Sequence, residues 1–548
     1  MGRTGRRETR DEPGRNRSVR DFSTPGRSPV YAANAAVATS HPLSTLAAIE
    51  VLRSGGNAVD AGIAAVAVQC VVDPLMTGIG GDCFALYAPK GARAPIALNG
   101  SGRSPAAAHD AWYLERGIAL APTSPHAVTV PGAVAAWAKL LDDHGTRSLG
   151  ELLQPAIRYA EDGYPVQPRV ALDWSRSVER VAGDPASAAT YLIDGRAPGV
   201  GTIMRHPKLA ATLARIAEHG PRGFYEGPVA EDIVARLRDL GGLHTLDDFA
   251  TAAPEIVTPV TTRYRGYDVY ECPPSGQGLA VLMMLNVLTH HDVARLSELD
   301  RVHLFAEACK QAYHHRDALF ADPVLNRVPV EHLLSEAWRA SAHGAIDMGR
   351  AQEPVIWPEL PNPEHVHKDT VYLSVVDRDG NALSLINSIF QGFGSGITAP
   401  ESGVLLHNRG LSFRIDPGHP NTIGPRKRPM HTIIPGMLMR DGETVAPFGV
   451  MGGHYQAMGH VELLTGIIDR GLDVQEALDA PRSFAYGGGV EMEPGFGEGV
   501  VAGLQARGHR TIPASGPIGG GQIIWIDRKA GVLAAGSDPR KDGSALGY

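Results

Sequence analysis

The order of apolar and polar residues predicts alternating strands and helices over most of the chain. The segment from residue 29 predicts a short strand, followed by a helix of about a dozen residues that ends at Gly55-Gly56. The next segment is an Ala-rich helix that is apolar on nearly every side, which indicates burial. A glycine-rich turn, "TGIGGDCF" at residues 77–84, then leads into another strand. It lacks the Lys-Ser/Thr pair of a P-loop and the GxGxxG spacing, so we do not expect it to bind phosphate.

The middle of the chain is predicted to be mainly helical. Apolar residues recur at i, i+3 and i+4 in the segments 131–145, 149–163, 228–242 and 301–323. Residues 264–288 predict a strand, a Pro/Gly turn and a buried helix. From residue 366 the chain is rich in strands, with helices predicted at 456–471 and 497–508 and late strands at 520–527 and 531–538. We find no internal repeat.

The junction at Asp369-Thr370 points to a specific chemistry. The runs "VYLSVVD" and "ALSLINSIF" after it predict two strands, and Asp379-Gly380 between them predicts a hairpin turn. Residues 354–368, which precede the junction, are rich in proline and predict an exposed linker. Thr370 is therefore either an ordinary strand residue, since threonine favours strands, or a residue that becomes an N-terminus.

The second interpretation supplies a mechanism. A threonine hydroxyl can attack the peptide carbonyl that precedes it, and hydrolysis of the resulting ester frees a new N-terminal threonine. Its Oγ is then the nucleophile, and its own α-amine, with an ordinary pKa of about 7.7–8.0, is the general base. Such a site needs no catalytic His or Asp, which agrees with the absence of a GxSxG motif from this chain.

Composition narrows the classes of partner and ligand. The chain has 548 residues with 43% hydrophobic residues, enough for one large α/β unit or more than one ordinary domain. The net charge of -8 argues against a nucleic-acid partner. The four cysteines form no CxxC pair, and His314 and His315 are adjacent and point in different directions on a helix, so we expect no metal and no cofactor.

The first 28 residues differ from the rest. Residues 1–27 carry eight Arg against four acidic residues and contain no apolar run of a secretory signal, which predicts a disordered Arg-rich tail over residues 1–28. No segment has about 18 consecutive apolar residues, so we expect no membrane span. The widely spaced cysteines are typical of a reducing compartment, and we expect a cytoplasmic location.

Motifs along the chain resemble those of the γ-glutamyltranspeptidases. They include "SHPLSTLAAIEVLRSGGNAVDAGIAA", "GIGGDCF", "YRGYDVYECPPSGQG", "DTVYLSVVDRDGNALSL", "SGVLLHN", "GPRKRPMHTIIP", "MGGHYQ" and "SDPRKDGSALGY". The resemblance runs from about residue 29 to residue 548 and keeps the order of every motif. It implies the α/β fold of N-terminal-nucleophile hydrolases, an αββα sandwich. It also implies autoproteolysis of a zymogen at Asp369-Thr370 into a large subunit (29–369) and a small subunit (370–548). The two would stay together as a heterodimer, and a dimer of heterodimers is open to them.

The resemblance also assigns catalytic roles. The family's nucleophile stands four residues before the Ser of "SVVD", which places it at Thr370. Ser388 matches the hydroxyl that contacts the nucleophile, and Gly452 and Gly453 match the paired glycines whose N–H groups hold the oxyanion. The residue after the nucleophile is often a second Thr and here is Val371.

The substrate pocket departs from the family pattern. Transpeptidases hold the donor's ammonium with an Asn, an acidic or amide residue and an Asp, and the matching positions here are Phe390, Arg409 and Ser412. An ammonium group bound beside Arg409 without hydrogen-bond acceptors would weaken substrate binding, because it loses its hydration and is repelled by the guanidinium. On the carboxylate side, the family's Ser pair is His431-Thr432 here, and its Arg is displaced to Arg103. We therefore expect Arg409, His431, Thr432 and Arg103 to bind the carboxylate of a small-molecule substrate.

These features are more similar to the oxamate amidohydrolase branch of the superfamily. The sequence thus favours an autoprocessing N-terminal-threonine amidohydrolase that hydrolyses a small, carboxylate-bearing amide through an acyl-enzyme on Thr370. The alternative within the family is a γ-glutamyl hydrolase or transferase that acts on glutathione and γ-glutamyl amides. An alternative of another class is an uncleaved, inactive homologue that binds a ligand, which the intact set of Thr370, Ser388, Gly452 and Gly453 disfavours.

Overall fold

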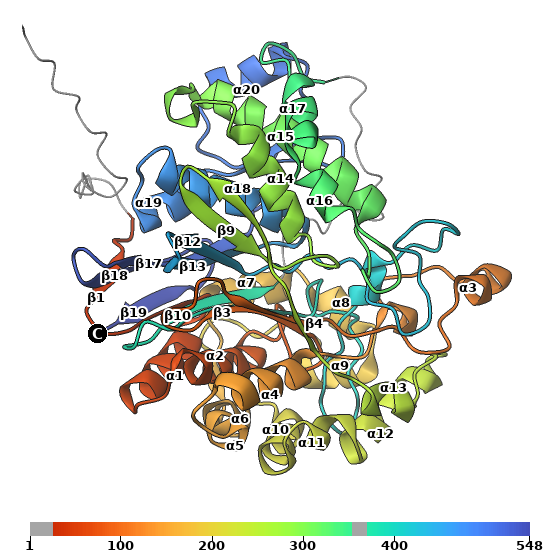
Figure 1. The fold of residues 1–548 in the computed structure, drawn as a ribbon. Coiled ribbons are helices and arrows are strands. Elements are labelled where there is room, and N and C mark those ends of the chain that lie inside the picture. The colour runs from red at the N-terminus through yellow and green to blue at the C-terminus, as the bar shows by residue number, and fades with distance from the viewer. Residues whose placement is uncertain (1–25, 353–369) are drawn as a thin grey trace, which may run out of the picture.

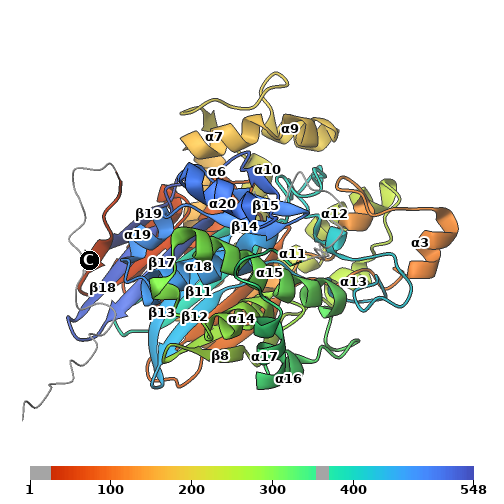
Figure 2. The ribbon, with the colours of Figure 1, turned by 90° about the horizontal axis from the view of Figure 1, so that it is seen from above.

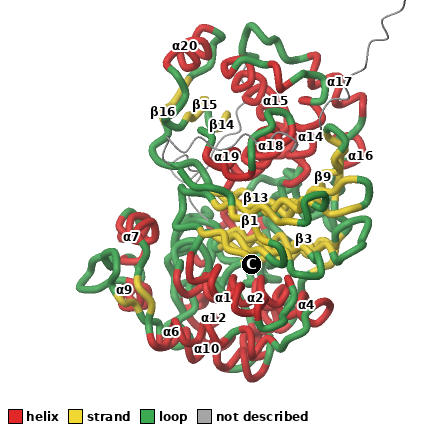
Figure 3. Tube along the Cα trace, turned by 90° about the vertical axis from the view of Figure 1, so that its left-hand side faces the viewer, coloured by secondary structure: helices red, strands yellow, loops and turns green. Residues whose placement is uncertain are grey.

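Two seven-stranded sheets lie face to face between two layers of helices (Figure 1). The side view separates the four layers, with the two sheets in yellow between helices in red (Figure 3). The structure is a computed structural model and describes residues 26–352 and 370–548. This arrangement confirms the expected αββα sandwich.

Both sheets are built from segments that lie far apart in the sequence. The first sheet has the order β1 (Val30–Ala32), β18 (Val532–Ser537), β17 (Gly520–Asp527), β13 (Glu443–Met451), β12 (Gly436–Arg440), β9 (Tyr267–Glu271), β8 (Val260–Tyr264). The second has the order β19 (Ser544–Gly547), β2 (Ala36–Thr39), β10 (Val371–Val376), β11 (Ala382–Ser388), β3 (Asp82–Ala88), β4 (Ile96–Gly100), β7 (Glu255–Val257). Smaller sheets are formed by β14 (Ser483–Tyr486), β15 (Gly489–Met492) and β16 (Thr511–Pro513), and by β5 (Tyr164–Pro165) and β6 (Ile203–Met204).

The helices divide between the two outer faces. The second sheet is covered by α1 (Pro42–Arg53), α2 (Ala58–Val72), α4 (Ala133–His144), α5 (Leu149–Leu152), α6 (Gln154–Asp162), α10 (Pro207–His219), α11 (Arg222–Tyr225), α12 (Pro228–Asp239) and α13 (Leu246–Ala250) (Figure 1). The first sheet is covered by α14 (Gly278–Leu288), α15 (Glu298–Leu319), α16 (Val330–Leu333), α17 (Glu336–Gly344), α18 (Gln456–Ile468), α19 (Val474–Asp479) and α20 (Glu498–Ala506). Seen from above, α7 (Pro168–Ser175) and α9 (Pro185–Tyr191), with α8 (Val178–Ala182) between them in sequence, and α3 (Asp110–Arg116) lie toward the periphery (Figure 2).

The elements predicted from periodicity are present where they were expected. The Ala-rich segment forms α2, and every residue of this helix is buried, because it packs between α1, α6 and the second sheet. The pattern at 149–163 forms two helices, α5 and α6, instead of one, because Pro155 occupies the first turn of α6 and cannot donate a backbone hydrogen bond to α5. All four cysteines are buried and free, as the sequence indicated.

The strand after Thr370 lies at the centre of the second sheet. β10 pairs with β2 on one side and with β11 on the other, and β11 pairs in turn with β3. All six residues of β10 are buried, since Val371, Leu373 and Val375 face the helices while Tyr372 faces the first sheet. The polar Ser374 is also buried, and it bonds to the Tyr372 hydroxyl and donates to the carbonyl of Pro447 in β13. Thr370 therefore directly precedes a strand that is fixed on both edges and both faces.

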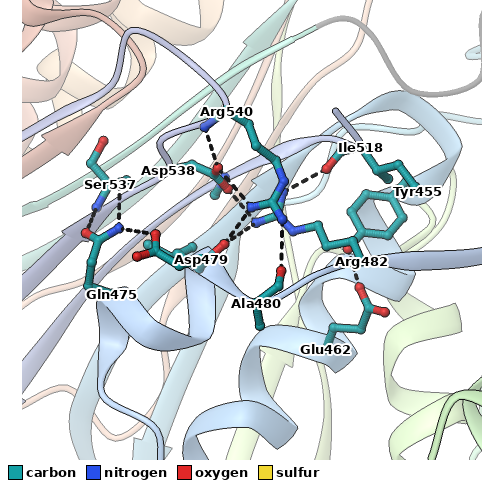
Figure 4. A network of polar contacts seen from close by, with 12 residues as sticks. Tyr455, Glu462, Gln475, Asp479, Ala480, Arg482, Ile518, Ser537, Asp538 and Arg540 are labelled. Carbon is teal, nitrogen blue, oxygen red and sulfur yellow. Dashed lines mark hydrogen bonds and ion pairs between the residues drawn. The ribbon is translucent and has the colours of Figure 1, made fainter. Parts of the chain in front are cut away.

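A buried ionic network ties the C-terminal segment to the first sheet (Figure 4). Asp538, which follows β18, is paired with Arg482 and lies 3.3 Å from Nη1 of Arg540. Its carboxylate also accepts the backbone N–H of Gly521 at 2.8 Å. Both arginines donate further to backbone carbonyls, Arg482 to Ile518 and Arg540 to Ala480. The carboxylate thus joins β17, β18 and the segment after α19.

Some expectations fall outside the described residues. These are the tail up to residue 25, the linker over residues 354–368, and Asp369. Among the described helices, none combines the length and the apolar composition that a bilayer crossing requires. The division at residue 369 into two subunits stays a prediction.

We expect Asp538→Ala to lower the free energy of unfolding by about 3–5 kcal/mol, because the buried guanidinium of Arg482 and the largely buried one of Arg540 lose their shared carboxylate. The matched control is Glu226→Ala, which breaks the exposed pair with Arg222 and should cost less than about 1 kcal/mol. Urea unfolding followed by tryptophan fluorescence measures both. Equal midpoints for the two variants would contradict the importance of the network.

Candidate active site

Thr370 lies against Ser388 at the end of the neighbouring strand. The two hydroxyl oxygens are 2.9 Å apart, and both side chains are buried. β10 and β11 are antiparallel, and Val371 pairs with Asn387, so the start of one strand meets the end of the other. Ser388 Oγ also accepts the backbone N–H of Phe390 at 2.9 Å. The expected contact between these two hydroxyl groups is therefore present.

Arg409 is a buried cation with one free edge. It belongs to the 3₁₀ helix η4 (Arg409–Ser412), and its Nη1 donates to Thr432 Oγ1 at 2.8 Å. Its guanidinium carbon lies 4.0 Å from the centre of the Phe390 ring, a cation–π distance. Nε and Nη2, along the other edge, have no hydrogen-bond partner among the described residues, although the side chain is 0% exposed. Burial lowers the pKa of Arg409 to about 9 and Asp82 opposes the shift, so the group is a cation at neutral pH.

A buried aspartate lies behind this arginine. Asp82 Oδ2 accepts a hydrogen bond from His431 Nε2 at 3.0 Å, and His407 Nδ1 lies 3.3 Å from the same oxygen at ion-pair distance. Burial alone would raise the pKa of Asp82, but His407 and His431 hold it below its ordinary value. Burial, followed by repulsion from Arg409, lowers the pKa of His431 to about 3, so His431 is neutral at physiological pH.

The glycine pair shortly precedes α18, one of the helices that cover the first sheet. Gly452 and Gly453 follow β13 directly, have φ values of 130° and 57°, and run through η5 (Gly453–Tyr455) into α18. A Cβ on Gly452 would lie 2.9 Å from the Cα of Gly519, so a larger residue does not fit. Gln277 fixes this turn, because its Nε2 donates to the carbonyls of both Thr432 and Gly453, at 2.6 and 3.0 Å. Backbone N–H groups at the start of a helix are suited to stabilise a negative charge.

These contacts connect the predicted residues into one site. Thr370 contacts Ser388, Ser388 contacts Phe390, and Phe390 stacks on Arg409. Arg409 then contacts Thr432, which Gln277 links to Gly453. A pair of contacting hydroxyl groups, a glycine turn at the start of a helix and a buried cation are thus within one set of contacts, an arrangement suited to acyl transfer from an anionic substrate.

Arg103 does not contact Arg409, His431 or Thr432, the other residues expected to bind the substrate carboxylate, in any of the described hydrogen bonds or ion pairs. Its guanidinium is held by Glu255 at 2.7 Å and Asp322 at 3.2 Å, and it lines a surface cavity of about 400 Å³ that contains neither Thr370 nor Arg409. Two carboxylates already balance its charge, so this arrangement does not favour a direct role in binding a substrate. Ser412 is on the same 3₁₀ helix as Arg409, and its buried hydroxyl has no partner among the residues that the structure describes.

Among the described residues, the one group of side chains close enough to share a metal ion is His303, Glu307 and His509. Its carboxylate is already paired with Lys310 at 2.5 Å, and its two imidazoles bond to each other at 2.7 Å. A divalent cation would add positive charge to a buried cluster that is already neutralised, so this geometry does not favour a metal. His314 and His315 are outside the group.

The sequence patterns missed three residues of this site. Asp82 and His407 were not singled out, and neither was Gln277, which is held in turn by Arg316 Nη1 at 2.7 Å. A carboxylate directly after a glycine pair, at the start of a buried strand, is a signal that sequence reasoning can use, because a buried charge needs partners. Gln277 carries no comparable signal, since its role depends on two loops meeting.

Comparisons with known proteins agree with this geometry. The family model described as gamma-glutamyltranspeptidase matches residues 44–548. The chain is 36% identical over 524 residues to the "Glutathione hydrolase-like YwrD proenzyme" of Bacillus subtilis (strain 168), covering 93% of this chain and 98% of that protein. It is 33% identical over 524 residues to the "Oxamate amidohydrolase proenzyme" of Klebsiella pneumoniae, covering 93% and 97%. The crystal structure of cephalosporin acylase from Bacillus halodurans superposes with a TM-score of 0.89 at 40% identity, covering 97% and 99%.

We expect the stability difference between wild type and His431→Gln to depend on pH. The folded pKa of His431 is about 3, below its ordinary value of 6.5, so the unfolded chain binds the extra proton as the pH falls below 6.5. The neutral imidazole therefore contributes stability above pH 6.5 that is lost toward pH 4, and the variant should lose less stability on acidification. Urea unfolding at pH 7 and pH 4.5 measures this.

The control for this experiment is Phe84→Leu. This change alters the ring that packs on His431 at 4.7 Å but removes no titratable group, so its cost should be the same at both pH values. A difference between wild type and His431→Gln that stays constant with pH would contradict the buried neutral state.

Proposed function

The chain belongs to the gamma-glutamyltranspeptidase family, and on that premise we propose that it is a self-cleaving hydrolase of small amides that carry a carboxylate. Thr370 is the nucleophile of both self-cleavage and turnover. The observation that carries the substrate class is the buried guanidinium of Arg409, whose Nε–Nη2 edge has no partner in the part of the chain that the structure describes.

Backbone strain at Thr370 supports self-cleavage. Its φ of 122° is rare for a β-branched residue, and a residue held in such a region costs on the order of 1–3 kcal/mol. The torsion φ exists only while the bond between residues 369 and 370 is intact, so cleavage relieves this strain. Oγ1 attacks the carbonyl carbon of residue 369, the amide nitrogen takes the proton and leaves, and an ester forms. The departure of the nitrogen frees the α-amine of Thr370, and water then hydrolyses the ester, which frees Oγ1 and leaves a carboxylate on residue 369.

After self-cleavage, Thr370 is also the nucleophile that attacks the substrate. The free α-amine accepts the proton of Oγ1 while Oγ1 attacks the substrate amide, and it returns that proton to the leaving amine. Ser388 orients the nucleophile through the hydroxyl contact at 2.9 Å. The N–H groups of Gly452 and Gly453 stabilise the tetrahedral oxyanion, and water hydrolyses the acyl-enzyme.

The sheet pairing supports a stable heterodimer of the two products. β10 and β11 begin the second product but lie between β2 and β3 of the first. β18 and β19 similarly pair with β1 and β2. Residues 29–369 and 370–548 therefore share both sheets, and cleavage at 369 separates no strand from its neighbours.

The chemistry of the pocket favours an anionic amide over a γ-glutamyl donor. The Nε–Nη2 edge presents two parallel N–H donors, the geometry that binds a carboxylate at both oxygens. A γ-glutamyl donor also brings an α-ammonium, and like charges about 4 Å apart at an effective dielectric constant of 20 repel by about 4 kcal/mol. Oxamate, an amide with an adjacent carboxylate, fits this description, and a relative named for it is 33% identical.

We expect the purified protein to consist of two fragments, with residues 370–548 beginning at Thr370. Thr370→Ala should stay uncleaved and inactive, because it removes the only side-chain oxygen of this position. Thr370→Ser keeps a hydroxyl and is the matched control, which should still cleave. Intact-mass analysis and N-terminal sequencing measure the outcome, and a single intact wild-type chain after prolonged incubation would contradict self-cleavage.

We expect Arg409→Gln to raise KM for anionic amides and to leave self-cleavage unchanged, because cleavage uses the protein's own peptide bond. A charge-assisted pair of this kind is worth about 1.5–3 kcal/mol, or roughly 10- to 150-fold in kcat/KM. Steady-state kinetics on oxamate and on a γ-glutamyl anilide measure it. The control Arg414→Gln removes an exposed arginine in the same loop and should change neither constant.

The γ-glutamyl alternative predicts a different result for the same variant. Removal of a cation from the binding site of an ammonium group would leave activity on the anilide unchanged or raise it. Full activity of Arg409→Gln on oxamate, or a gain on the anilide, would contradict the assignment of an anionic substrate.

A further inference from the structure

We infer that Asp82 is a positioning residue that fixes the two segments carrying Arg409 and Thr432, so that the Nε–Nη2 edge of Arg409 stays open toward the substrate carboxylate. The inference rests on the proposed function and assigns to it a residue of the glycine-rich turn at 77–84. This turn matched no phosphate motif in the sequence, and its aspartate has no other role in the proposed reaction.

One carboxylate oxygen joins both sides of the anion site. Oδ2 of Asp82 receives the hydrogen bond of His431, the residue before Thr432, and faces His407, two residues before Arg409. His407 is fixed from behind, because its Nε2 lies 2.8 Å from the carbonyl of Thr129, which can only accept. Arg409 and Thr432 are hydrogen-bonded to each other. Displacement of either imidazole therefore changes the geometry of the Arg409–Thr432 pair.

The surroundings of Asp82 require two acceptor oxygens. Oδ1 accepts the backbone N–H of Gly102 at 2.8 Å, and Oδ2 accepts from His431 at 3.0 Å. An asparagine has the same shape but only one acceptor, so in either orientation its amide N–H₂ faces an N–H group. His431 cannot adapt simply by moving its hydrogen, since its Nδ1 already accepts the N–H of Ile433. Asp82→Asn is thus a small change in volume that must shift at least one partner.

The glycines before Asp82 allow this turn to pack closely against the segments that carry Ser388 and Leu405. A Cβ on Gly81 would lie 2.3 Å from the carbonyl oxygen of Ser388, and one on Gly80 would lie 2.1 Å from that of Leu405. The turn is therefore fixed against the strand end that carries Ser388 and against the segment that leads to Arg409. Asp82 holds its position with little freedom to adapt to a changed partner.

A second role for the same carboxylate makes the opposite prediction. Asp82 raises the pKa of Arg409 and so acts on it as a counter-charge. If Asp82 did only this, its removal would make the pocket more positive and would strengthen the binding of an anion. Positioning predicts weaker binding instead, so the direction of the change in KM separates the two roles.

The test compares Asp82→Asn, Arg409→Gln and the double variant with wild type, each as the full chain after self-cleavage, with oxamate as the substrate. We expect Asp82→Asn to raise KM about tenfold or more and to change kcat less than about threefold. Because Asp82 acts through Arg409, the double variant should have the KM of Arg409→Gln alone, not the product of both effects. Asp82→Glu, which restores two acceptor oxygens, should recover part of the loss.

The matched control is Asp60→Asn. Asp60 is a buried carboxylate at the start of α2 that accepts from Asn57 and Thr146, away from the site, so its loss should lower stability without changing KM. If Asp82→Asn gives no folded enzyme, His407→Gln removes one of the two imidazoles and should raise KM in the same way.

The outcomes separate the inference from the function on which it rests. An unchanged or lowered KM for Asp82→Asn, or effects that multiply in the double variant, would overturn the role of Asp82 while Arg409→Gln still raises KM. If Arg409→Gln itself leaves KM for oxamate unchanged, the proposed function fails, and the role of Asp82 fails with it.

Discussion

Arg409 is a buried cation to which the described residues offer a hydrogen-bond partner along only one edge, and the organisation of the site follows from this constraint. A buried guanidinium needs partners for its donors, because loss of hydration costs several kcal/mol per ion. Thr432 binds one side, Phe390 covers a face, and the remaining edge has no partner within residues 26–352 and 370–548. A substrate carboxylate would accept hydrogen bonds from Nε and Nη2. Binding of such a substrate would therefore satisfy the donors of Arg409 that the protein leaves without partners.

The same constraint explains why the site is rigid. A cation in a flexible loop would find water or a backbone carbonyl, and its free edge would be lost. Here Asp82 anchors the two flanking segments through His407 and His431, and Gln277 fixes the turn at Gly453. All of these side chains lie between or beside the two sheets, where they are almost completely buried. The sandwich thus supplies the stiffness that an unpaired buried charge requires.

Much of the fold was predictable from particular residues. The apolar segment at 58–72 has no polar face and could only be a buried helix, and the runs on either side of Asp379-Gly380 could only pair as a hairpin. The candidate site was predictable where motifs are short and local: Thr370 and Ser388 are in contact, and Gly452 and Gly453 lead into a helix, while their catalytic roles stay predictions. The carboxylate role of Arg103 was predicted from its displaced motif, but its charge is engaged by Glu255 and Asp322, which approach from distant segments.

The sequence by itself determined which elements form and which residues are candidates for the chemistry, because periodicity, turn residues and motif order are properties of neighbouring positions. It also determined that ammonium acceptors are missing, since Phe390, Arg409 and Ser412 occupy their positions. Only the tertiary structure decided which N–H donors of Arg409 have a hydrogen-bond acceptor and which have none among the described residues. That outcome depends on Asp82, His407, Thr432 and Gln277, which are separated by up to several hundred positions and meet only when the two sheets stack. Hydrogen bonding acts over about 3 Å in space, and a linear pattern carries no record of such distances.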